Sequence, residues 1–201
     1  TGLGCKSTMH RRRFSMNLED FSAGLAELIE RPSRLRPFVC DGSPLKCLVF
    51  IVGHNPATVS DRDFWEDWGP DGFDKESWMA AYIEERANRP LKPGKSYRPR
   101  ISPSRRVIDQ VVAAAGMPIL ETNIYAGTSP DMRSLGERDI APFHYLVETI
   151  KPNLLITHGK DAKEAADRLA LPGEIISVPH FSRGWSKEKA IELGRALRAR
   201  F

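Results

Sequence analysis

Amide, hydroxyl and imidazole side chains follow directly after four short apolar segments of the sequence. The pairs are His54 and Asn55, Thr122 and Asn123, Thr157 and His158, and His180 with Ser182. If these segments are parallel strands of one sheet, their carboxyl ends lie along one edge, where open α/β sheets bind ligands. Each pair alone is compatible with an ordinary turn or a satisfied backbone group. Four pairs together favour one shared site.

The residue types in this set restrict the chemistry. The sequence contains no Gly-X-Ser-X-Gly motif, no cysteine with a plausible histidine partner and no His-Glu-X-X-His zinc motif. Asparagine offers one acceptor and two donors and cannot act as a strong base. Amides and imidazoles suit three tasks: orienting a water molecule, reading the edge of a heterocycle and stabilising an anionic leaving group. We therefore expect neither a metal nor another cofactor.

The first of the four segments organises the chain. Leu45–Thr58 begins with eight residues that are mostly apolar and show no polar helical face, which is typical of a strand buried on both sides. Gly53 permits a sharp turn, and Pro56 fixes the backbone just beyond it. His54 and Asn55 are thereby held at the carboxyl end of a central strand.

Strands and helices alternate along the rest of the sequence. Further strands are predicted at Pro118–Tyr125, Asn153–His158 and Glu174–Pro179, and helices at Asn17–Arg31, Asp74–Asn88, Pro103–Ala115, Glu137–Lys151, Lys160–Ala170 and Ser186–Arg200. Ser102 and Gly116 are the expected caps of the third helix. This alternation predicts a three-layer α/β/α fold with a four-stranded, mostly parallel, doubly wound sheet. Residues 17–201 are expected to form a single domain.

Composition excludes several classes of protein. No apolar run approaches the ~20 residues of a membrane span, and the three cysteines match neither a disulfide framework nor a zinc pattern. We expect a cytoplasmic monomer without a membrane partner. The net charge of +4 resides entirely in residues 1–16, predicted to be a flexible basic tail, so any surface for nucleic acid must be local.

Two segments have unusual composition. Ser60–Glu76 holds four aromatic residues among seven acids and two bases, which suggests a lid or an aromatic-lined loop. Pro90–Arg106 contains six basic residues, four prolines and no acid. A solvated linker is one interpretation of this second segment. Contact with phosphates is the other, and it favours Arg98 and Arg100 as DNA-backbone ligands.

The motifs resemble those of the uracil-DNA glycosylase superfamily. Gly53-His54-Asn55-Pro56 is similar to the Gly-X-Asn-Pro motif of its mismatch-specific and single-strand-selective branches, and Glu-Thr-Asn-Ile-Tyr carries an asparagine, Asn123, where the family has a base-reading one. His180-Phe181-Ser182 partly matches the last motif, His-Pro-Ser, with Phe181 in place of proline. The resemblance covers roughly residues 45–198 in order and spacing.

The resemblance implies a role for each matching residue. Asn55 would position the attacking water and His180 would stabilise the departing base, as the two catalytic residues. The base-binding residues would be Gly53, His54 and Asn123, with a stacking aromatic among Phe64, Trp65 and Trp68. The wedge and DNA-backbone contacts would lie at Ser182, Arg183 and Gly184. Ala57 follows the motif's proline, and its small side chain implies tolerance of bases enlarged at C5.

Two functions follow from this resemblance, and a third reading stays open. The first is a base-excision-repair enzyme that flips a uracil or a related damaged pyrimidine out of DNA and hydrolyses its N-glycosidic bond. The alternative is a member of the superfamily that binds nucleic acid or nucleotides without cleaving them. An α/β domain whose crevice serves an unrelated small molecule is the third.

Overall fold

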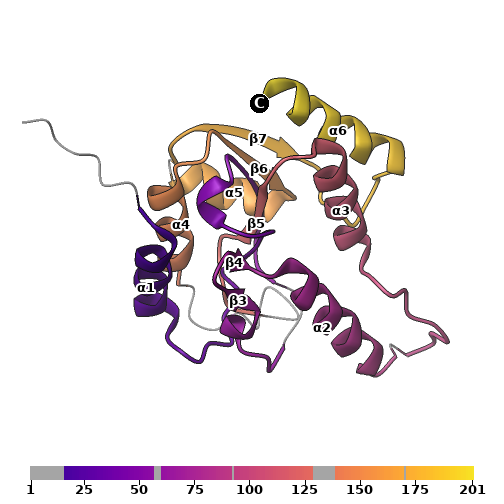
Figure 1. The fold of residues 1–201 in the computed structure, drawn as a ribbon. Helices are drawn as coiled ribbons and strands as arrows, with labels where there is room; N and C mark the ends of the chain where they lie inside the picture. The colour runs from indigo at the N-terminus through magenta and orange to yellow at the C-terminus, as the bar shows by residue number, and fades with distance from the viewer. Residues whose placement is uncertain (1–15, 57–59, 92, 129–138, 170) are drawn as a thin grey trace, which may run out of the picture.

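One mixed sheet of five strands forms the centre of the protein (Figure 1). In spatial order the strands are β1 (Phe38–Val39), β5 (Ile119–Asn123), β2 (Val49–Gly53), β6 (Leu154–His158) and β7 (Glu174–Val178). The last four run parallel, and β1 pairs antiparallel with β5. The structure is a computed structural model that describes residues 16–56, 60–91, 93–128, 139–169 and 171–201.

The predicted α/β class and the mostly parallel sheet are confirmed, but the sheet has five strands rather than four. The additional strand, β1, is only two residues long, too short to show a periodic pattern. The first predicted strand also begins later than expected. Pro44–Lys46 forms a short 3-10 helix, and β2 starts at Val49.

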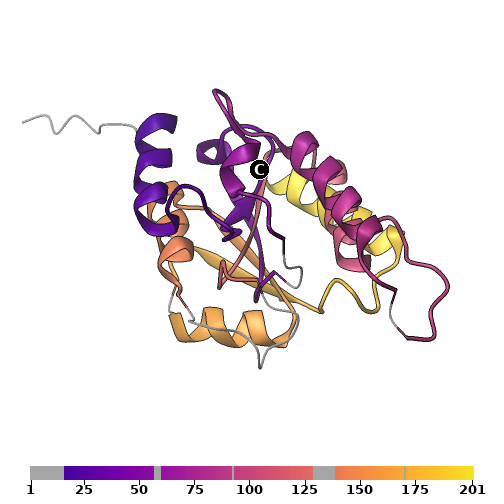
Figure 2. The same ribbon diagram turned by 90° about the horizontal axis from the view of Figure 1, so that it is seen from below.

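Helices pack on both faces of the sheet, as Figures 1 and 2 show. Phe50 and Val52 of β2 point into a core with α1 (Leu18–Ile29), α4 (Ala141–Ile150) and α5 (Lys160–Leu169). Val49 and Ile51 point the other way, toward α3 (Pro103–Ala115) and α6 (Lys187–Arg200). Because both faces of β2 are buried, its sequence shows no polar alternation.

Local capping chemistry determines where the helices begin. Asn17, Ser102 and Ser186 each accept a hydrogen bond from a backbone N–H of the first turn, at α1, α3 and α6. Asp74 does the same for α2 (Lys75–Asn88). Gly116 ends α3 in the left-handed conformation, with φ of 60°. The predicted caps of α3 are confirmed.

The segment Ser60–Glu76, predicted to be a lid or an aromatic-lined loop, folds into short regular elements. Residues Phe64–Asp67 form a 3-10 helix, and β3 (Trp68–Gly69) pairs with β4 (Gly72–Phe73) in a small hairpin. Phe64 and Phe73 are buried in the core on the α1 face, where their rings stack with centroids 5.5 Å apart. The prediction of a loop missed these elements, because the mixed composition concealed a tertiary aromatic cluster.

Of the predicted basic tail, residues 1–15 lie outside the described part of the chain. Within the described ranges, no helix combines the length and the apolar composition that crossing a membrane requires.

Candidate functional site

The backbone after β2 is fixed by continued pairing with the segment after β5. The carbonyl oxygens of Gly53 and His54 accept hydrogen bonds of 3.0 Å from the amides of Ile124 and Tyr125. The His54 ring also meets the Tyr125 ring edge to face, with centroids 5.0 Å apart. The Gly-His-Asn-Pro turn is thereby anchored at the carboxyl edge of the sheet, where the sequence predicted it.

The Asn55 carboxamide lies within this turn. Its Oδ1 is 3.2 Å from His54 Nδ1, and its Nδ2 donates to the carbonyl oxygen of Pro56 at 3.3 Å. Asn55 and His54 are both half-buried. The next position, Ala57, to which the C5 prediction refers, lies outside the described residues.

Gly53, Asn123 and His158 meet at the ends of three adjacent strands. Gly53 pairs in register with Asn123, and His158 is the last residue of the neighbouring β6. A Cβ atom on Gly53 would lie 2.4 Å from Asn123 Oδ1 and 3.0 Å from His158 Nε2. A larger residue here would displace the Asn123 side chain, because both polar atoms occupy the space directly above the α-carbon of Gly53.

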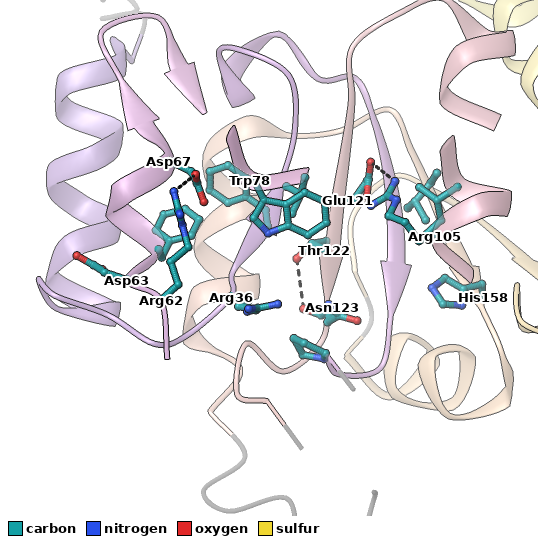
Figure 3. Close-up of a pocket in the computed structure, with 16 residues that line it drawn as sticks. Arg36, Arg62, Asp63, Asp67, Trp78, Arg105, Glu121, Thr122, Asn123 and His158 are labelled. Carbon is teal, nitrogen blue, oxygen red and sulfur yellow. Dashed lines mark hydrogen bonds and ion pairs between the residues drawn. The ribbon is translucent and has the colours of Figure 1, made fainter. Parts of the chain in front are cut away.

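A cavity of about 160 Å³ opens beside Asn123 and His158 (Figure 3). Its apolar lining is Phe38, Val39, Ile51, Pro56, Phe64, Trp78 and Ile108, and its polar lining is Arg36, Arg62, Asp63, Asp67, Arg105, Glu121, Thr122, Asn123 and His158. A cavity of roughly 150 Å³ is large enough to hold one benzene molecule. This cavity is therefore sized for a single planar ring.

A buried ion-pair network forms one wall of the cavity. Arg105 of α3 binds the Glu121 carboxylate through both terminal nitrogens, and Lys75 Nζ lies 2.7 Å from Glu121 Oε1. Arg105 and Glu121 are each only 7% exposed. Burial acts to raise the pKa of Glu121, but the charges of Arg105 and Lys75 outweigh it and hold that pKa below its usual value. Glu121 is thus ionised and fully engaged.

Two further ion pairs complete the polar lining. Arg62 Nη2 lies 2.7 Å from Oδ1 of Asp67, a residue that is only 2% exposed. Arg36 Nη2 lies 3.4 Å from Glu85 Oε2. In the view of Figure 3 the Trp78 indole lies between the Arg62–Asp67 pair and the Arg105–Glu121 pair. The cavity therefore combines an aromatic wall with arginine side chains that are already paired with carboxylates of the protein.

His158 is held rigidly at the cavity wall and is neutral. Its ring stacks on Phe181 with centroids 4.6 Å apart and meets the His180 ring edge to face at 5.0 Å. Burial, with a smaller contribution from His180, lowers the pKa of His158 to about 3. Its Nδ1 is buried and has no hydrogen-bond partner among the described residues.

His180 is exposed and lies outside the cavity lining, in a neighbouring open depression with Ser182 and Arg183. Its Nδ1 accepts the backbone N–H of Ser182 at 3.1 Å and lies 2.7 Å from Ser182 Oγ. Since Nδ1 accepts, the proton of the neutral ring is on Nε2. Partial burial and then the charge of Arg183 lower the pKa of His180, which favours this neutral donor. Gly184 is also exposed and has φ of 71°.

The structure distinguishes the three aromatic candidates. Phe64 lines the cavity, whereas Trp65 and Trp68 do not. Trp65 donates through Nε1 to the carbonyl of Glu30 at 2.7 Å, and Trp68 stacks on Phe21 with centroids 6.1 Å apart. Stacking on a ring in this cavity is therefore open to Phe64 but not to these two tryptophans.

Two of the basic residues in Pro90–Arg106 serve the fold rather than a ligand. The Arg98 guanidinium donates to the backbone carbonyls of Arg86 and Arg89, both at 3.0 Å, and to that of Pro90. Arg105 is buried against Glu121. The predicted phosphate contact is therefore not supported for Arg98, but Arg100 is exposed and remains a candidate.

Sequence reasoning missed Glu121, Arg105 and Trp78 as parts of the site. One signal was present: a carboxylate in the middle of an apolar strand is rarely buried unless it is paired. Among the described residues, no group of three or more His, Cys, Asp or Glu side chains is arranged to hold a metal ion. Comparison of the chain with protein-family models and with curated proteins finds no match.

Proposed function

We propose that the protein is a DNA glycosylase that hydrolyses the N-glycosidic bond of uracil or a related damaged pyrimidine. The observation that carries this proposal is the placement of Asn123 Oδ1 and His158 Nε2 above Gly53, at a cavity sized for one planar ring. A carboxamide at such a place can pair with the hydrogen-bonding edge of a flipped base.

The finer features of the fold support the same proposal. The resemblance stated above implies four parallel strands between two layers of helices. The parallel set β5-β2-β6-β7, with helices against both faces, fits that arrangement, and β1 is an addition at its edge.

The proposed reaction distributes three tasks among the polar residues. Asn123 binds the base, with Phe64 as the aromatic surface nearest to it in the cavity lining. The bond between the base nitrogen and C1′ of the sugar breaks, and its electron pair leaves with the base. His180 Nε2–H stabilises the negative charge that develops there. A water held by the Asn55 carboxamide then attacks C1′ of the oxocarbenium-like sugar, and the proton that this water loses passes to the surrounding solvent.

A direct assay tests this proposal. Uracil-containing oligonucleotides are incubated with the protein and then treated with alkali, which breaks the strand wherever a base has been removed. We expect cleavage by the wild-type protein and a rate roughly 10²–10³-fold lower for Asn55→Ala, by analogy with the loss of one positioned polar group. Asn88→Ala, at the exposed end of α2, is the matched control and should cleave normally.

One observation favours a second candidate function, binding without cleavage. His180 is not part of the cavity lining, and the Asn55 carboxamide is hydrogen-bonded within its own turn. A nucleic-acid- or nucleotide-binding protein needs the cavity but neither catalytic group. The same oligonucleotides separate the two functions: saturable binding in a mobility-shift assay, with no strand broken by alkali, would establish the second candidate and reject the first.

A further inference from the structure

Two exposed large apolar side chains lie on the loop between α2 and α3. This α2–α3 loop comprises residues 89–102, of which residue 92 lies outside the described part of the chain. It carries Leu91 and Tyr97, which are 47% and 72% exposed, and no large apolar side chain among the described residues is more exposed than Tyr97. Single exposed apolar residues are common on protein surfaces, so the surroundings of Tyr97 decide whether it has a role.

The residue after Tyr97 fixes the loop to α2. The Arg98 guanidinium donates hydrogen bonds to three backbone carbonyls at the carboxyl end of α2 and just beyond it. In the other direction, Arg86 Nε of α2 donates to the Pro99 carbonyl at 2.8 Å. A backbone that is already held in this way loses little conformational freedom when it binds a ligand. The loop therefore presents the Tyr97 ring in a pre-organised position.

The charge around Tyr97 is positive. Between Asn88 and Pro103 the sequence contains five basic residues and no acidic residue. Lys95 and Arg100 lie on either side of Tyr97 in the sequence, and both are exposed. An aromatic ring between cations is the combination with which proteins bind single-stranded nucleic acid, because a base stacks on the ring and the cations contact the phosphates.

Two other partners fit the α2–α3 loop less well. An anionic membrane also attracts cations and aromatic rings, but stable anchoring requires more apolar surface than the two side chains of Leu91 and Tyr97 supply. A nucleic-acid duplex offers phosphates to the cations, but its bases are stacked on one another and leave no free face for Tyr97. The loop therefore suits an unpaired strand.

The α2–α3 loop also lies within reach of the cavity along a nucleic-acid strand. Figures 1 and 2 show residues 93–102 projecting from the body of the protein before the start of α3. Tyr97 precedes Arg105, which lines the cavity, by eight residues, and a chain of that length spans at most about 29 Å. At about 3.4 Å per nucleotide, as in one strand of a duplex, this distance corresponds to roughly eight nucleotides.

We propose that the α2–α3 loop is a second nucleic-acid contact, separate from the cavity, at which Tyr97 stacks on an unpaired base while Lys95 and Arg100 contact the adjoining phosphates. The inference rests on the proposed function only for the position of the strand relative to the cavity. The ligand of this loop is a single-stranded flank, and not the damaged base itself. An unpaired flank should therefore bind more tightly than the same sequence in a duplex.

Binding of a fluorescein-labelled oligothymidylate, measured by fluorescence anisotropy, tests the stacking role. Tyr97→Ala should weaken binding roughly 5–150-fold, which is the range for the loss of one base stack. Tyr97→Phe keeps the ring and should bind nearly as the wild type does, whereas Tyr97→Leu is apolar without a ring and should resemble Tyr97→Ala. Phe201→Ala removes another exposed aromatic ring and is the matched control. Unchanged binding in Tyr97→Ala would overturn the inference.

A strand of the same length that has sugars and phosphates but no bases separates stacking from charge attraction. The wild type and Tyr97→Ala should bind this strand equally, and Arg100→Ala should weaken binding to both strands. An equal loss on both strands in Tyr97→Ala would contradict stacking. Vesicles of equal parts phosphatidylserine and phosphatidylcholine test the other partner: binding to them that requires Tyr97, with no effect on the oligonucleotide, would assign the loop to a membrane instead.

These measurements are independent of the test of the proposed function, because none of the strands contains uracil. If the wild type cleaves no uracil-containing oligonucleotide, the glycosylase proposal fails, and the dependence of binding on Tyr97 still decides the inference. If the wild type cleaves such DNA but Tyr97→Ala binds oligothymidylate normally, the inference fails and the proposed function stands. A wild-type protein that does not bind oligothymidylate even at low salt would also overturn the inference.

Discussion

At the scale of single residues, the candidate site is defined by how closely Gly53, Asn123 and His158 approach one another, and not by an unusually reactive side chain. Gly53 has only a hydrogen atom as its side chain, and beside it lie the carboxamide of Asn123 and the neutral imidazole of His158. None is a strong acid or base near neutral pH, since the pKa of His158 is about 3. These groups form a candidate site because they lie close together. Activity should therefore depend more on the positions of their atoms than on their charges.

Gly53→Ala is the sharpest test of that view. The new methyl group would lie 2.4 Å from Asn123 Oδ1, so the Asn123 side chain must move. Because the end of a flexible side chain can yield, we expect little change in the melting temperature. A displacement of about 1 Å can cost on the order of 10²-fold in activity, which kcat/KM on uracil-containing DNA would measure.

Gly127→Ala is the matched control for this substitution, because a Cβ atom there meets nothing within 4 Å. It should leave both the melting temperature and kcat/KM unchanged. Full activity in Gly53→Ala would show that Asn123 does not read the base from its present position.

The buried His158 ring should make stability depend on pH. Its folded pKa of about 3 lies below the unfolded value of about 6.5. Between these values the unfolded chain holds one proton more, so the free energy of unfolding falls as the pH falls. From neutral pH to pH 5 the loss attributable to His158 is about 2 kcal/mol.

Urea unfolding of the wild type and of His158→Gln at several pH values measures this difference. The range between roughly pH 5 and pH 7 lies above the titration of most carboxyl groups, so the variant should show a distinctly smaller slope there. Equal slopes in the two proteins would mean that His158 takes up a proton in the folded state.

At the scale of elements, the loop after α2 is tied to the end of that helix. Arg98 donates to carbonyl groups of the last turn, and Arg86 Nε returns a hydrogen bond of 2.8 Å to the Pro99 carbonyl. A cation at the carboxyl end of a helix both caps it and complements its dipole. Some of the charged side chains of this loop therefore hold it against the helix, and only the others face solvent.

Two arginines in this loop should behave differently. Arg98→Ala removes the cap of α2 and should lower the free energy of unfolding by about 1–2 kcal/mol. Arg100→Ala should leave stability unchanged. If Arg100 contacts a phosphate, its loss reduces the slope of log binding constant against log salt concentration by ~0.9 on duplex DNA.

Thermal unfolding and salt titrations of binding distinguish the two effects. Arg98→Lys serves as a control, because it keeps the charge but loses the forked donor geometry, and it should be intermediate in stability. An unchanged salt slope in Arg100→Ala would show that Arg100 does not contact a DNA phosphate.

The same elements show what sequence patterns can and cannot predict. The caps of α3 are local, so Ser102 and Gly116 could be identified from their types and spacing. Asn123 could be identified because its strand ends at the predicted edge. Glu121 and Arg105 are 16 residues apart and meet only after α3 has packed on the sheet. Nothing local distinguishes Arg105 from the solvent-facing cations beside it.

At the scale of the whole molecule, the buried network joins three elements around the cavity. Lys75 comes from α2, Arg105 from α3 and Glu121 from β5. A buried ion pair contributes little net stability compared with apolar residues, but losing one member leaves the other charge uncompensated. The network therefore specifies how the elements sit around the cavity.

Glu121→Gln tests the cost of breaking this network. The variant leaves two cations buried beside a neutral amide, and we expect the free energy of unfolding to fall by roughly 3–5 kcal/mol. The pKa of Glu121 is lowered, so its contribution is complete above about pH 4.5 and is lost as the pH falls further. Urea unfolding at pH 7 and at pH 4 measures both effects.

The triple variant Lys75→Met, Arg105→Met, Glu121→Leu is the control, because it removes all three charges of the network together. It should recover most of the stability that the single variant loses. A single variant as stable as the wild type would show that solvent reaches this pair.

The meeting of Gly53, Asn123 and His158 also has a consequence for how the protein is made. These residues come from β2, β5 and β6, and the last of them follows Asn55 by more than a hundred positions. At ribosomal rates of roughly 5–20 residues per second, this interval takes about 5–20 s. Once Asn123 has been made, the growing chain carries both asparagines of the proposed site but still lacks His158, which lines the cavity. A translation product that stops before β6 therefore lacks part of the cavity lining. If the proposed function holds, such a product should not cleave uracil-containing DNA.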